Sequence, residues 1–408
     1  MEKSSQNRKN KAVNIILSIV FIPLFVLCLA WALTNVHPMG ASAAAKTPAA
    51  TAEPVSTPEP IASATPAEEV QEEIEPAVTP EPKKHYVIPE GALAGPAPDE
   101  SLYGTVSKDS PEDMLPVIEK AREYGLLEED EYVVFDPGAE FYKGLYSDDI
   151  KYYLDETIFA VLWKEVIDGK SCSLAEVKIA DASQLRRKLA DDTFGGYNQY
   201  YASDLAVSAN AVVAMNADYY LFRDFGIVIY DRELKRFNTG TYLNPYLKYN
   251  CIDSLFINSE GDFLYKTILE ENTEESIKQF AADNDILFSL AFGPVLVKDG
   301  QAQTCDWYPL GEIDVGYSRA GIGQVGKLHY LWMSVNHGDV SGSWTINEFA
   351  QHFAEKNVDS AYCLDGGQTG EVVFQGAPYN HVDFGAERTV SDIIYFVSAI
   401  PEGERSAG

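Results

Sequence analysis

An acidic residue followed at once by two glycines, Asp365, Gly366 and Gly367, is the arrangement in this chain that most directly suggests chemistry. The carboxylate could accept a proton, and glycine N–H groups let another molecule approach the backbone closely. Apolar runs at residues 360–364 and 371–374 flank the motif, and each predicts a short strand. The same pattern is typical of a tight hairpin turn, so two interpretations stay open: a turn, or the floor of a site.

Arg319 and Arg388 are the best candidates for binding a phosphate group. A guanidinium group stays charged and presents a planar fork of donors that matches phosphate oxygens. The alternative is a structural ion pair, which is natural in a chain whose formal net charge is −31. That acidity repels an anionic ligand at long range, so local cations become more necessary at a phosphate site.

Further candidates are polar residues close to these motifs. Asn216 could orient a sugar hydroxyl and Asp218 could activate a water molecule, although each could equally satisfy a turn. Thr369, together with Gly366 and Gly367, completes the predicted binding set. His337 precedes a glycine at a strand end, a pattern more typical of a turn than of acid–base work.

Six blocks, in this order and spacing, resemble the phosphodiester glycosidase family, which includes the "uncovering enzyme", N-acetylglucosamine-1-phosphodiester alpha-N-acetylglucosaminidase. The blocks lie at residues 215–220, 292–300, 318–323, 331–338, 364–367 and 387–391. The resemblance covers residues 155–400 and implies a mixed α/β domain that hydrolyses a sugar 1-phosphodiester. Asp365 or Asp218 would then be catalytic, and Arg319 and Arg388 would hold the phosphate.

The chain departs from the family pattern at two positions. Gln368 follows the glycine pair where the family commonly has another small residue, and Thr389 follows Arg388 where proline is common. A long amide at position 368 could narrow the phosphate pocket and change the substrate.

Strand and helix signals alternate along the region that must position these residues. A capping box at Thr345 and Glu348 predicts a helix, since apolar residues then recur on one helical face. Other expected helices lie at residues 110–124, begun by Ser110 and a proline, and 274–282. Expected strands include residues 132–135, 157–163 and 174–179. The expected fold class is α+β: a mixed, strand-rich sheet domain with a few packed helices.

Several ligand classes are disfavoured. Residues 321–326 match G-x-G-x-x-G, but the aromatic and apolar residues 327–333 that follow predict a strand where a nucleotide site needs a helix. The net charge argues against a nucleic-acid partner. No cofactor and no metal are expected, because no cluster of cysteine and histidine stands out.

The N-terminal region predicts export. Residues 12–33 form an uncharged run that would span about 33 Å as a helix, enough to cross a bilayer. Basic residues within 1–11 place that tail in the cytoplasm, so the expected location is the cell membrane, single-pass, with an extracellular C-terminal domain. Signal-peptide cleavage near residues 41–43, giving a secreted protein, is the alternative.

The rest divides by composition. Residues 34–100 are rich in Pro, Thr, Ala and Glu and predict a disordered linker, followed by an accessory region at 101–154 and the main domain at 155–400. Four cysteines in an exported domain allow disulfides, while isolated buried thiols are the alternative. They are Cys172, Cys251, Cys305 and Cys363.

The sequence therefore predicts an extracellular hydrolase that cleaves the glycosidic bond of a sugar 1-phosphodiester in cell-envelope or exopolysaccharide glycans. A non-catalytic module that binds envelope glycans on the same fold is the main alternative. A metal-dependent phosphodiesterase that cuts the P–O bond ranks last, because no His/Asp metal cluster is evident.

Overall fold

The computed structural model describes residues 84–137, 146–306, 308–309, 313–335 and 343–405. All belong to one compact unit, residues 81–408. Among them no helix is both long and apolar enough to cross a bilayer. The predicted span at residues 12–33 and the histidine at position 337 lie outside the described residues.

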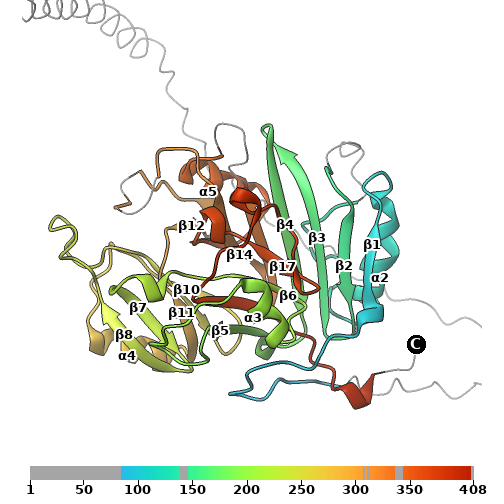
Figure 1. The fold of residues 1–408 in the computed structure, drawn as a ribbon, viewed down its shortest axis with the longest axis horizontal. Helices are drawn as coiled ribbons and strands as arrows, with labels where there is room; N and C mark the ends of the chain where they lie inside the picture. The colour runs from blue at the N-terminus through green and yellow to red at the C-terminus, as the bar shows by residue number, and fades with distance from the viewer. Residues whose placement is uncertain (1–83, 138–145, 307, 310–312, 336–342, 406–408) are drawn as a thin grey trace, which may run out of the picture. The chain divides into compact units, whose positions relative to one another are not determined.

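A nine-stranded antiparallel sheet forms the centre of the unit (Figure 1). Its strands, in spatial order, are β1 (Tyr103–Val106), β2 (Ile150–Leu154), β3 (Ile158–Ile167), β4 (Lys170–Ile179), β15 (His329–Val335), β14 (Arg319–Gly326), β16 (Ser360–Leu364), β12 (Val295–Lys298) and β13 (Gln301–Ala302). The G-x-G-x-x-G pattern therefore lies inside strand β14. Its first two glycines serve close packing, since a Cβ on Gly321 would lie 2.9 Å from the Phe353 ring and one on Gly323 would lie 3.0 Å from the Ser360 carbonyl oxygen.

A five-stranded antiparallel sheet packs against the central sheet. It contains β18 (Ala377–Pro378), β17 (Val372–Phe374), β6 (Val213–Asn216), β19 (Asp392–Phe396) and β5 (Leu185–Leu189), in that order. Smaller sheets are formed by β10 (Phe263–Lys266), β9 (Ser254–Asn258) and β11 (Ile286–Leu290), and by β7 (Gly226–Tyr230) with β8 (Glu233–Asn238).

The central strands are buried on both faces, which explains their continuous apolar sequence. In β3, Phe159 and Val161 face one core, while Ala160 and Leu162 face a second core shared with the five-stranded sheet. Because successive side chains point to opposite faces of the strand, one apolar run contributes to both hydrophobic cores.

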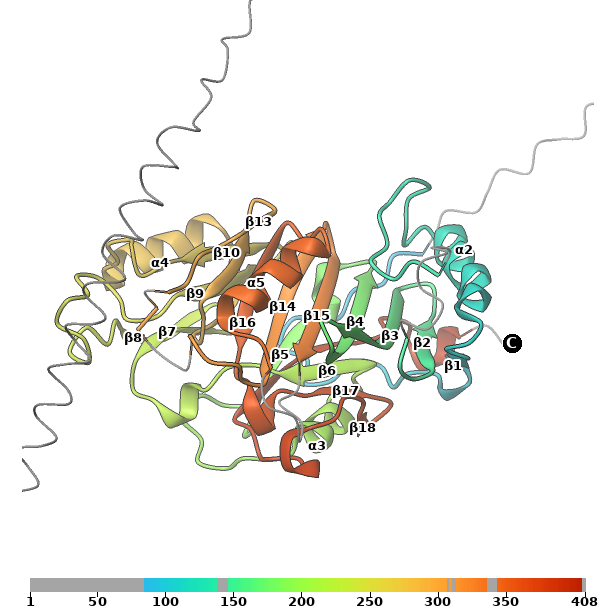
Figure 2. The same cartoon turned by 90° about the horizontal axis from the view of Figure 1, so that it is seen from above.

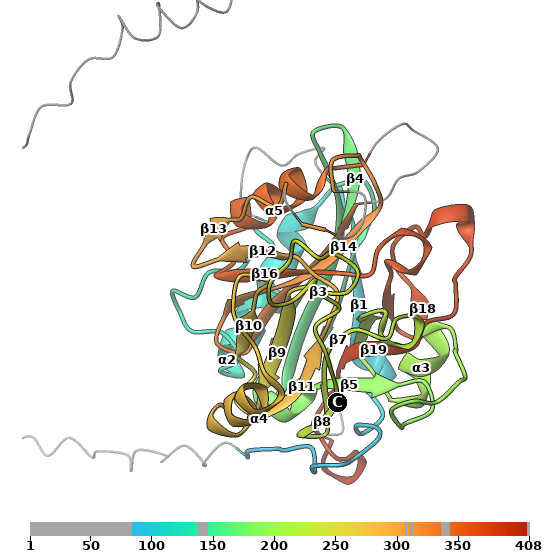
Figure 3. The same cartoon turned by 90° about the vertical axis from the view of Figure 1, so that its left-hand side faces the viewer.

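Among the described residues, four helices cover the sheets: α2 (Leu115–Glu123), α3 (Ala202–Ser208), α4 (Glu274–Asp283) and α5 (Ile346–Glu355). Helix α5 lies against β12, β13 and β14 (Figure 2). Helix α3 packs on β6, β17 and β19, on the far side of the five-stranded sheet (Figure 3). The predicted strand-rich fold with a few packed helices is confirmed.

The predicted capping box of α5 is confirmed: Thr345 accepts from the Glu348 N–H, and Glu348 accepts from the Thr345 N–H. The cap predicted at Ser110 is wrong. Its side chain makes no capping hydrogen bond, and a 3-10 turn at Pro111–Met114 precedes α2. The last turn ends as expected, with Gly125 at a positive φ of 71°.

The strand predicted at residues 132–135 is also wrong. The N–H groups of Val134 and Phe135 donate to the buried carboxylate of Glu176, each at 2.8 Å. A side chain from β4 therefore satisfies backbone donors that a neighbouring strand would otherwise take.

The segment 84–100, assigned to the linker from composition, lies against the domain. Ile88 is 3% exposed and packs beside α3, and its N–H donates to Ser183 Oγ at 2.9 Å. Strands β1 and β2, from the predicted accessory region, extend the nine-stranded sheet. The four cysteines of the described domain are buried free thiols, which agrees with the second of the two expectations for them.

Candidate active site

The Asp365 motif does not form a hairpin. The strand before it, β16, belongs to the nine-stranded sheet, and the strand after it, β17, belongs to the five-stranded sheet. Residues 365–370, here called the 365–370 loop, therefore cross from one sheet to the other. The hairpin interpretation is wrong because the flanking strands find their partners elsewhere in the chain.

The glycine pair is needed for this crossing. A Cβ on Gly366 would lie 2.4 Å from the carbonyl oxygen of Ser318, a contact that real side chains do not make. Gly367 has a φ of +62°, and its N–H donates to the same carbonyl at 3.0 Å. The two glycines thus let the loop lie directly on the start of β14.

The end of β6 fixes the backbone of Asp365. The Asp365 N–H donates to the Ala217 carbonyl at 3.3 Å, and the side-chain amide of Asn216 donates to the Asp365 carbonyl. The amide oxygen of Asn216 accepts from the Glu371 N–H at 3.3 Å. Both ends of the buried Asn216 side chain therefore bind backbone, and Asn216 positions the loop.

Asp365 lines a cavity of about 260 Å³. Of the predicted site residues, six line it: Arg319, Asp365, Gly366, Gly367, Thr369 and Arg388. Among the described lining residues, Asp365 is the one acidic residue, and Arg319 and Arg388 are the two basic ones. Tyr219, Phe292 and Tyr317 supply aromatic wall. The combination suits an anion held beside a carboxylate.

The carboxylate of Asp365 is tuned by opposing effects. Burial raises the pKa of Asp365 to about 6. This value already includes the opposing effects of the Thr369 hydroxyl, which donates to Oδ2 at 2.7 Å, and of the nearby cations Arg223 and Arg388, all of which lower the pKa. The group is therefore mostly ionised at neutral pH and still basic enough to accept a proton.

The two arginines differ in their environment. Arg319 is buried at the start of β14, where Nε donates to the Trp344 carbonyl at 3.3 Å and Nη2 to the Val315 carbonyl at 3.0 Å. Arg388 is exposed and lies on the 383–388 segment, here called the 383–388 loop. Arg319 is thus fixed by the wall, while Arg388 depends on its loop for position.

Asp218 does not line the cavity. Its buried carboxylate accepts the N–H groups of Tyr220 and Ala291, at 2.6 and 2.9 Å, and lies 3.3 Å from the guanidinium of Arg187. Arg187 also pairs with Asp392 at 2.6 Å. Burial raises the pKa of Asp392, and Arg187 opposes that rise. This arrangement makes Asp218 part of a buried ion cluster beneath the site.

Two residues near the site were not found from sequence. Arg223 lies over the rings of Tyr219, Phe225 and Phe292, with centroid distances of 5.1 to 5.2 Å. The sequence signal for Arg223 was its position as a cation within the aromatic run 219–225. Arg187 gave no local signal, because its two acidic partners are distant in sequence.

Gln368, where the chain departs from the family pattern, connects two loops. It lines the cavity, and its Nε2 donates to the Ala386 carbonyl at 3.0 Å. Ser318 Oγ makes a second connection, donating to both carboxylate oxygens of Asp383 at 2.9 and 2.8 Å. The amide therefore fastens the loop that carries Arg388. Thr389, the other departure, donates to Gln199 Oε1 at 3.1 Å.

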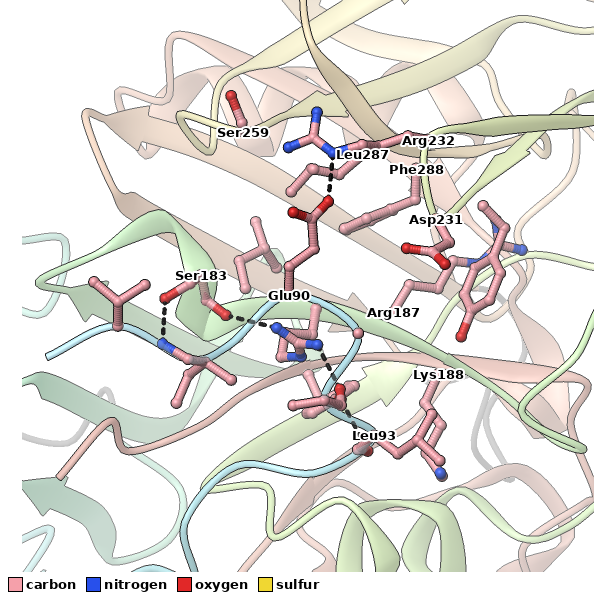
Figure 4. Close-up of a pocket in the computed structure, with 18 of the residues that line it drawn as sticks. Glu90, Leu93, Ser183, Arg187, Lys188, Asp231, Arg232, Ser259, Leu287 and Phe288 are labelled. Atoms are coloured by element: carbon pink, nitrogen blue, oxygen red, sulfur yellow. Dashed lines mark hydrogen bonds and ion pairs between the residues drawn. The ribbon is translucent and has the colours of Figure 1, made fainter. Parts of the chain in front are cut away.

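A larger cavity of about 380 Å³ lies elsewhere, between the 87–93 segment and strand β5 (Figure 4). It contains none of the predicted site residues. Its cations already have partners: Arg232 pairs with Glu90 at 2.6 Å, and Lys188 pairs with Asp192. In the described part of the chain, no group of three or more His, Cys, Asp or Glu side chains could hold a metal ion.

Comparison with known proteins decides the family. The model of the phosphodiester glycosidase family matches residues 209–397, which include all of the 365–370 loop and both candidate arginines. This match identifies residues 209–397 as a phosphodiester glycosidase domain. The resemblance stated from sequence is confirmed over this part of the chain.

The phosphodiester glycosidase domain is also similar to individual proteins. The SPbeta prophage-derived uncharacterized protein YomE of Bacillus subtilis (strain 168) is 29% identical over 119 residues, which are 28% of this chain and 18% of that protein. The match thus spans less than a fifth of that relative's length.

Solved structures are more distant. The catalytic domain of zebrafish N-acetylglucosamine-1-phosphodiester alpha-N-acetylglucosaminidase, auto-inhibited by its pro-peptide, is 13% identical, with a TM-score of 0.45, over 73% of this chain and 88% of that chain. A hypothetical protein from Synechocystis is also 13% identical, with a TM-score of 0.42, over 60% of this chain and 62% of that chain. The family assignment rests on the family model.

Proposed function

We propose that the phosphodiester glycosidase domain hydrolyses the glycosidic bond of a sugar 1-phosphodiester. The observation that carries this proposal is one cavity lined by a single acidic residue, Asp365, and by two basic residues, Arg319 and Arg388, among its described residues. A phosphate between the arginines and an anomeric carbon near Asp365 would satisfy both kinds of group.

In the proposed reaction, Asp365 accepts a proton from a water molecule whose oxygen attacks the anomeric carbon. The bond from that carbon to the phosphate oxygen breaks, and its electron pair leaves with the phosphate. Arg319 and Arg388 stabilise the negative charge that the phosphate gains. The products are a free sugar and a phosphate monoester.

A single carboxylate is consistent with this leaving group. Most glycosidases use a second carboxylic acid to protonate the departing oxygen. A phosphate monoester leaves without strong protonation, so stabilisation of its charge replaces part of that acid's role. Asn216 and Asp218 are proposed as positioning residues, because their side chains are occupied by backbone and by Arg187.

We place the substrate among cell-envelope or exopolysaccharide glycans and the domain outside the cell, attached to the membrane by residues 12–33. The charged, Pro-rich composition of residues 34–83 supports a spacer between membrane and domain. Fractionation of cells and protease access to the domain test this location.

The test of activity is full-length protein on a panel of sugar 1-phosphodiesters, including esters of α-N-acetylglucosamine 1-phosphate. In ¹⁸O-labelled water the released phosphate monoester should carry no label; label in phosphate would show P–O cleavage instead. Asp365→Asn should lower kcat by at least about 100-fold while the fold persists.

Arg388→Ala should raise KM about tenfold or more, as expected for losing a charge-assisted hydrogen bond. Lys298→Ala, which removes an exposed cation outside the cavity, is the matched control. Binding of the diesters without turnover of any would contradict the hydrolase and favour a glycan-binding module.

A further inference from the structure

A turn held against the wall of the cavity places a phenylalanine where glycine or asparagine is favoured. The Gly385 N–H donates to the Val382 carbonyl at 3.0 Å and closes a four-residue turn. Phe384, its third residue, has φ 64° and ψ 8°. This left-handed conformation is costly for a residue with a bulky side chain and favours glycine or asparagine.

The phenyl ring gains nothing from burial in return. Phe384 is 90% exposed, although phenylalanine is among the most hydrophobic side chains. An exposed apolar residue alone needs no explanation. Exposure combined with an unfavourable backbone conformation is different, because such strain concentrates where a residue serves binding or catalysis.

Two contacts hold this turn beside the candidate active site. On one side of Phe384, the Asp383 carboxylate accepts from Ser318 Oγ. On the other side, the Ala386 carbonyl accepts from Gln368 Nε2 at 3.0 Å. Ser318 and Gln368 both line the cavity. Phe384 therefore lies next to the cavity wall, between two fixed points, although it does not line the cavity itself.

We propose that Phe384 forms part of a subsite for an apolar aglycone, the alcohol that is esterified to the substrate's phosphate. The inference rests on the proposed function, which places the sugar beside Asp365 and the phosphate beside Arg388. The second ester of that phosphate would then extend along the 383–388 loop, which carries the cavity-lining Arg388. Residues 384–386 are Phe, Gly and Ala, all exposed, so this uncharged stretch of the loop, between Asp383 and Glu387, offers hydrocarbon to this group.

The experiment measures binding of two phosphate monoesters, hexyl phosphate and methyl phosphate, to the full-length protein by calorimetry. These are products of the proposed reaction, have nearly equal phosphate acidity and differ in apolar length. The wild type should bind hexyl phosphate about three- to tenfold more tightly, as partial burial of a phenyl ring predicts. Phe384→Gly should reduce the ratio to near one, and Phe384→Leu should keep most of it.

Controls separate recognition from folding. Phe384→Gly should melt at a temperature no lower than the wild type, because glycine adopts the turn conformation without strain. Tyr246→Gly removes another highly exposed ring, 95% exposed and outside the cavity, and should leave the binding ratio unchanged.

Equal binding of the two esters by the wild type would overturn the subsite, as would an unchanged ratio in Phe384→Gly. Since the assay needs no turnover, it also stands apart from the proposed hydrolysis. The expected ratios without cleavage of any diester would support the apolar subsite and contradict the hydrolase alone.

Discussion

The low-pH side of the activity profile, here called the acid limb, should be set by Asp365. Its environment raises and lowers its pKa through opposing interactions. Burial raises the pKa, the Thr369 hydroxyl and the nearby arginines lower it, and the net value is about 6. A general base works when ionised, so kcat/KM for the proposed hydrolysis should rise with pH through about 6.

Thr369→Val should move this limb to higher pH by about half a unit to one unit. The hydroxyl donates a hydrogen bond to the ionised carboxylate, and its removal disfavours ionisation and raises the pKa of Asp365. The pH dependence of kcat/KM measures the shift. Thr369→Ser, which keeps the hydroxyl, should retain the wild-type limb, and a limb that moves to lower pH in the valine variant would contradict this account.

Glu371, buried next to the 365–370 loop, should make the stability of the fold depend on pH. Burial, and to a lesser extent the nearby Glu387, raise the pKa of Glu371 from 4.5 to about 8. The folded chain therefore holds a proton that the unfolded chain releases above its lower pKa. Stability from this group is complete below about pH 4.5 and is lost as pH rises toward 8.

Glu371→Gln should remove this dependence, because the amide does not ionise. At pH 8.5 the variant should be more stable than the wild type by about 2 kcal/mol, and at pH 5 it should have no such advantage. Urea unfolding at the two pH values measures the difference. The exposed Glu129→Gln serves as control, and an equal gain at both pH values would show that ionisation is not the cause.

At the scale of elements, two loops from different parts of the chain make the site, and Gln368 joins them. Its amide fastens the 383–388 loop through the Ala386 carbonyl, so the position of Arg388 depends on it. The residue that departs from the family pattern thus has a structural task that the sequence did not reveal.

Gln368→Ser should raise KM for a diester about two- to tenfold with kcat changed little, the effect of losing one hydrogen bond that orients a binding group. Gln303→Ser provides a matched control, since the Gln303 amide also donates to a backbone carbonyl, at 2.8 Å, away from the cavity. A fall in kcat with KM unchanged would place the role of Gln368 in the chemical step.

Local sequence patterns predicted helices and strands correctly where the deciding interactions come from neighbouring residues. The capping box of α5 and the apolar runs of β3 and β16 depend on neighbouring residues, and the structure confirms them. The strand predicted at residues 132–135 is wrong because N–H groups in this segment donate hydrogen bonds to the carboxylate of Glu176. No neighbouring residue could have signalled that contact.

At the candidate active site, too, contacts with residues far along the chain could not be predicted from local sequence patterns. The carboxylate and two arginines that line one cavity were all candidates from sequence, because their residue types suit the chemistry. The environments of Asn216 and Asp218 could not be predicted. Each is set by a residue far along the chain, the Asp365 carbonyl for one and Arg187 for the other.

For the molecule as a whole, the formal net charge of −31 opposes the approach of an anionic substrate. Salt screens distant charges more strongly than a direct contact between arginine and phosphate. Raising ionic strength from 20 to 150 mM should therefore increase kcat/KM for a diester, roughly two- to fivefold. Sucrose at equal osmolarity is the control, and a steady decrease with salt would show that the local cations dominate approach as well.

Because the 365–370 loop crosses between two sheets, the candidate active site forms only when both sheets have folded and docked. Asp365 leaves one sheet and is held by residues of the other, Asn216 and Ala217. A chain in which either sheet has formed alone lacks a correctly held acid. Recovery of activity after refolding should therefore never precede the docking of the sheets, so a catalytic assay would count only finished molecules.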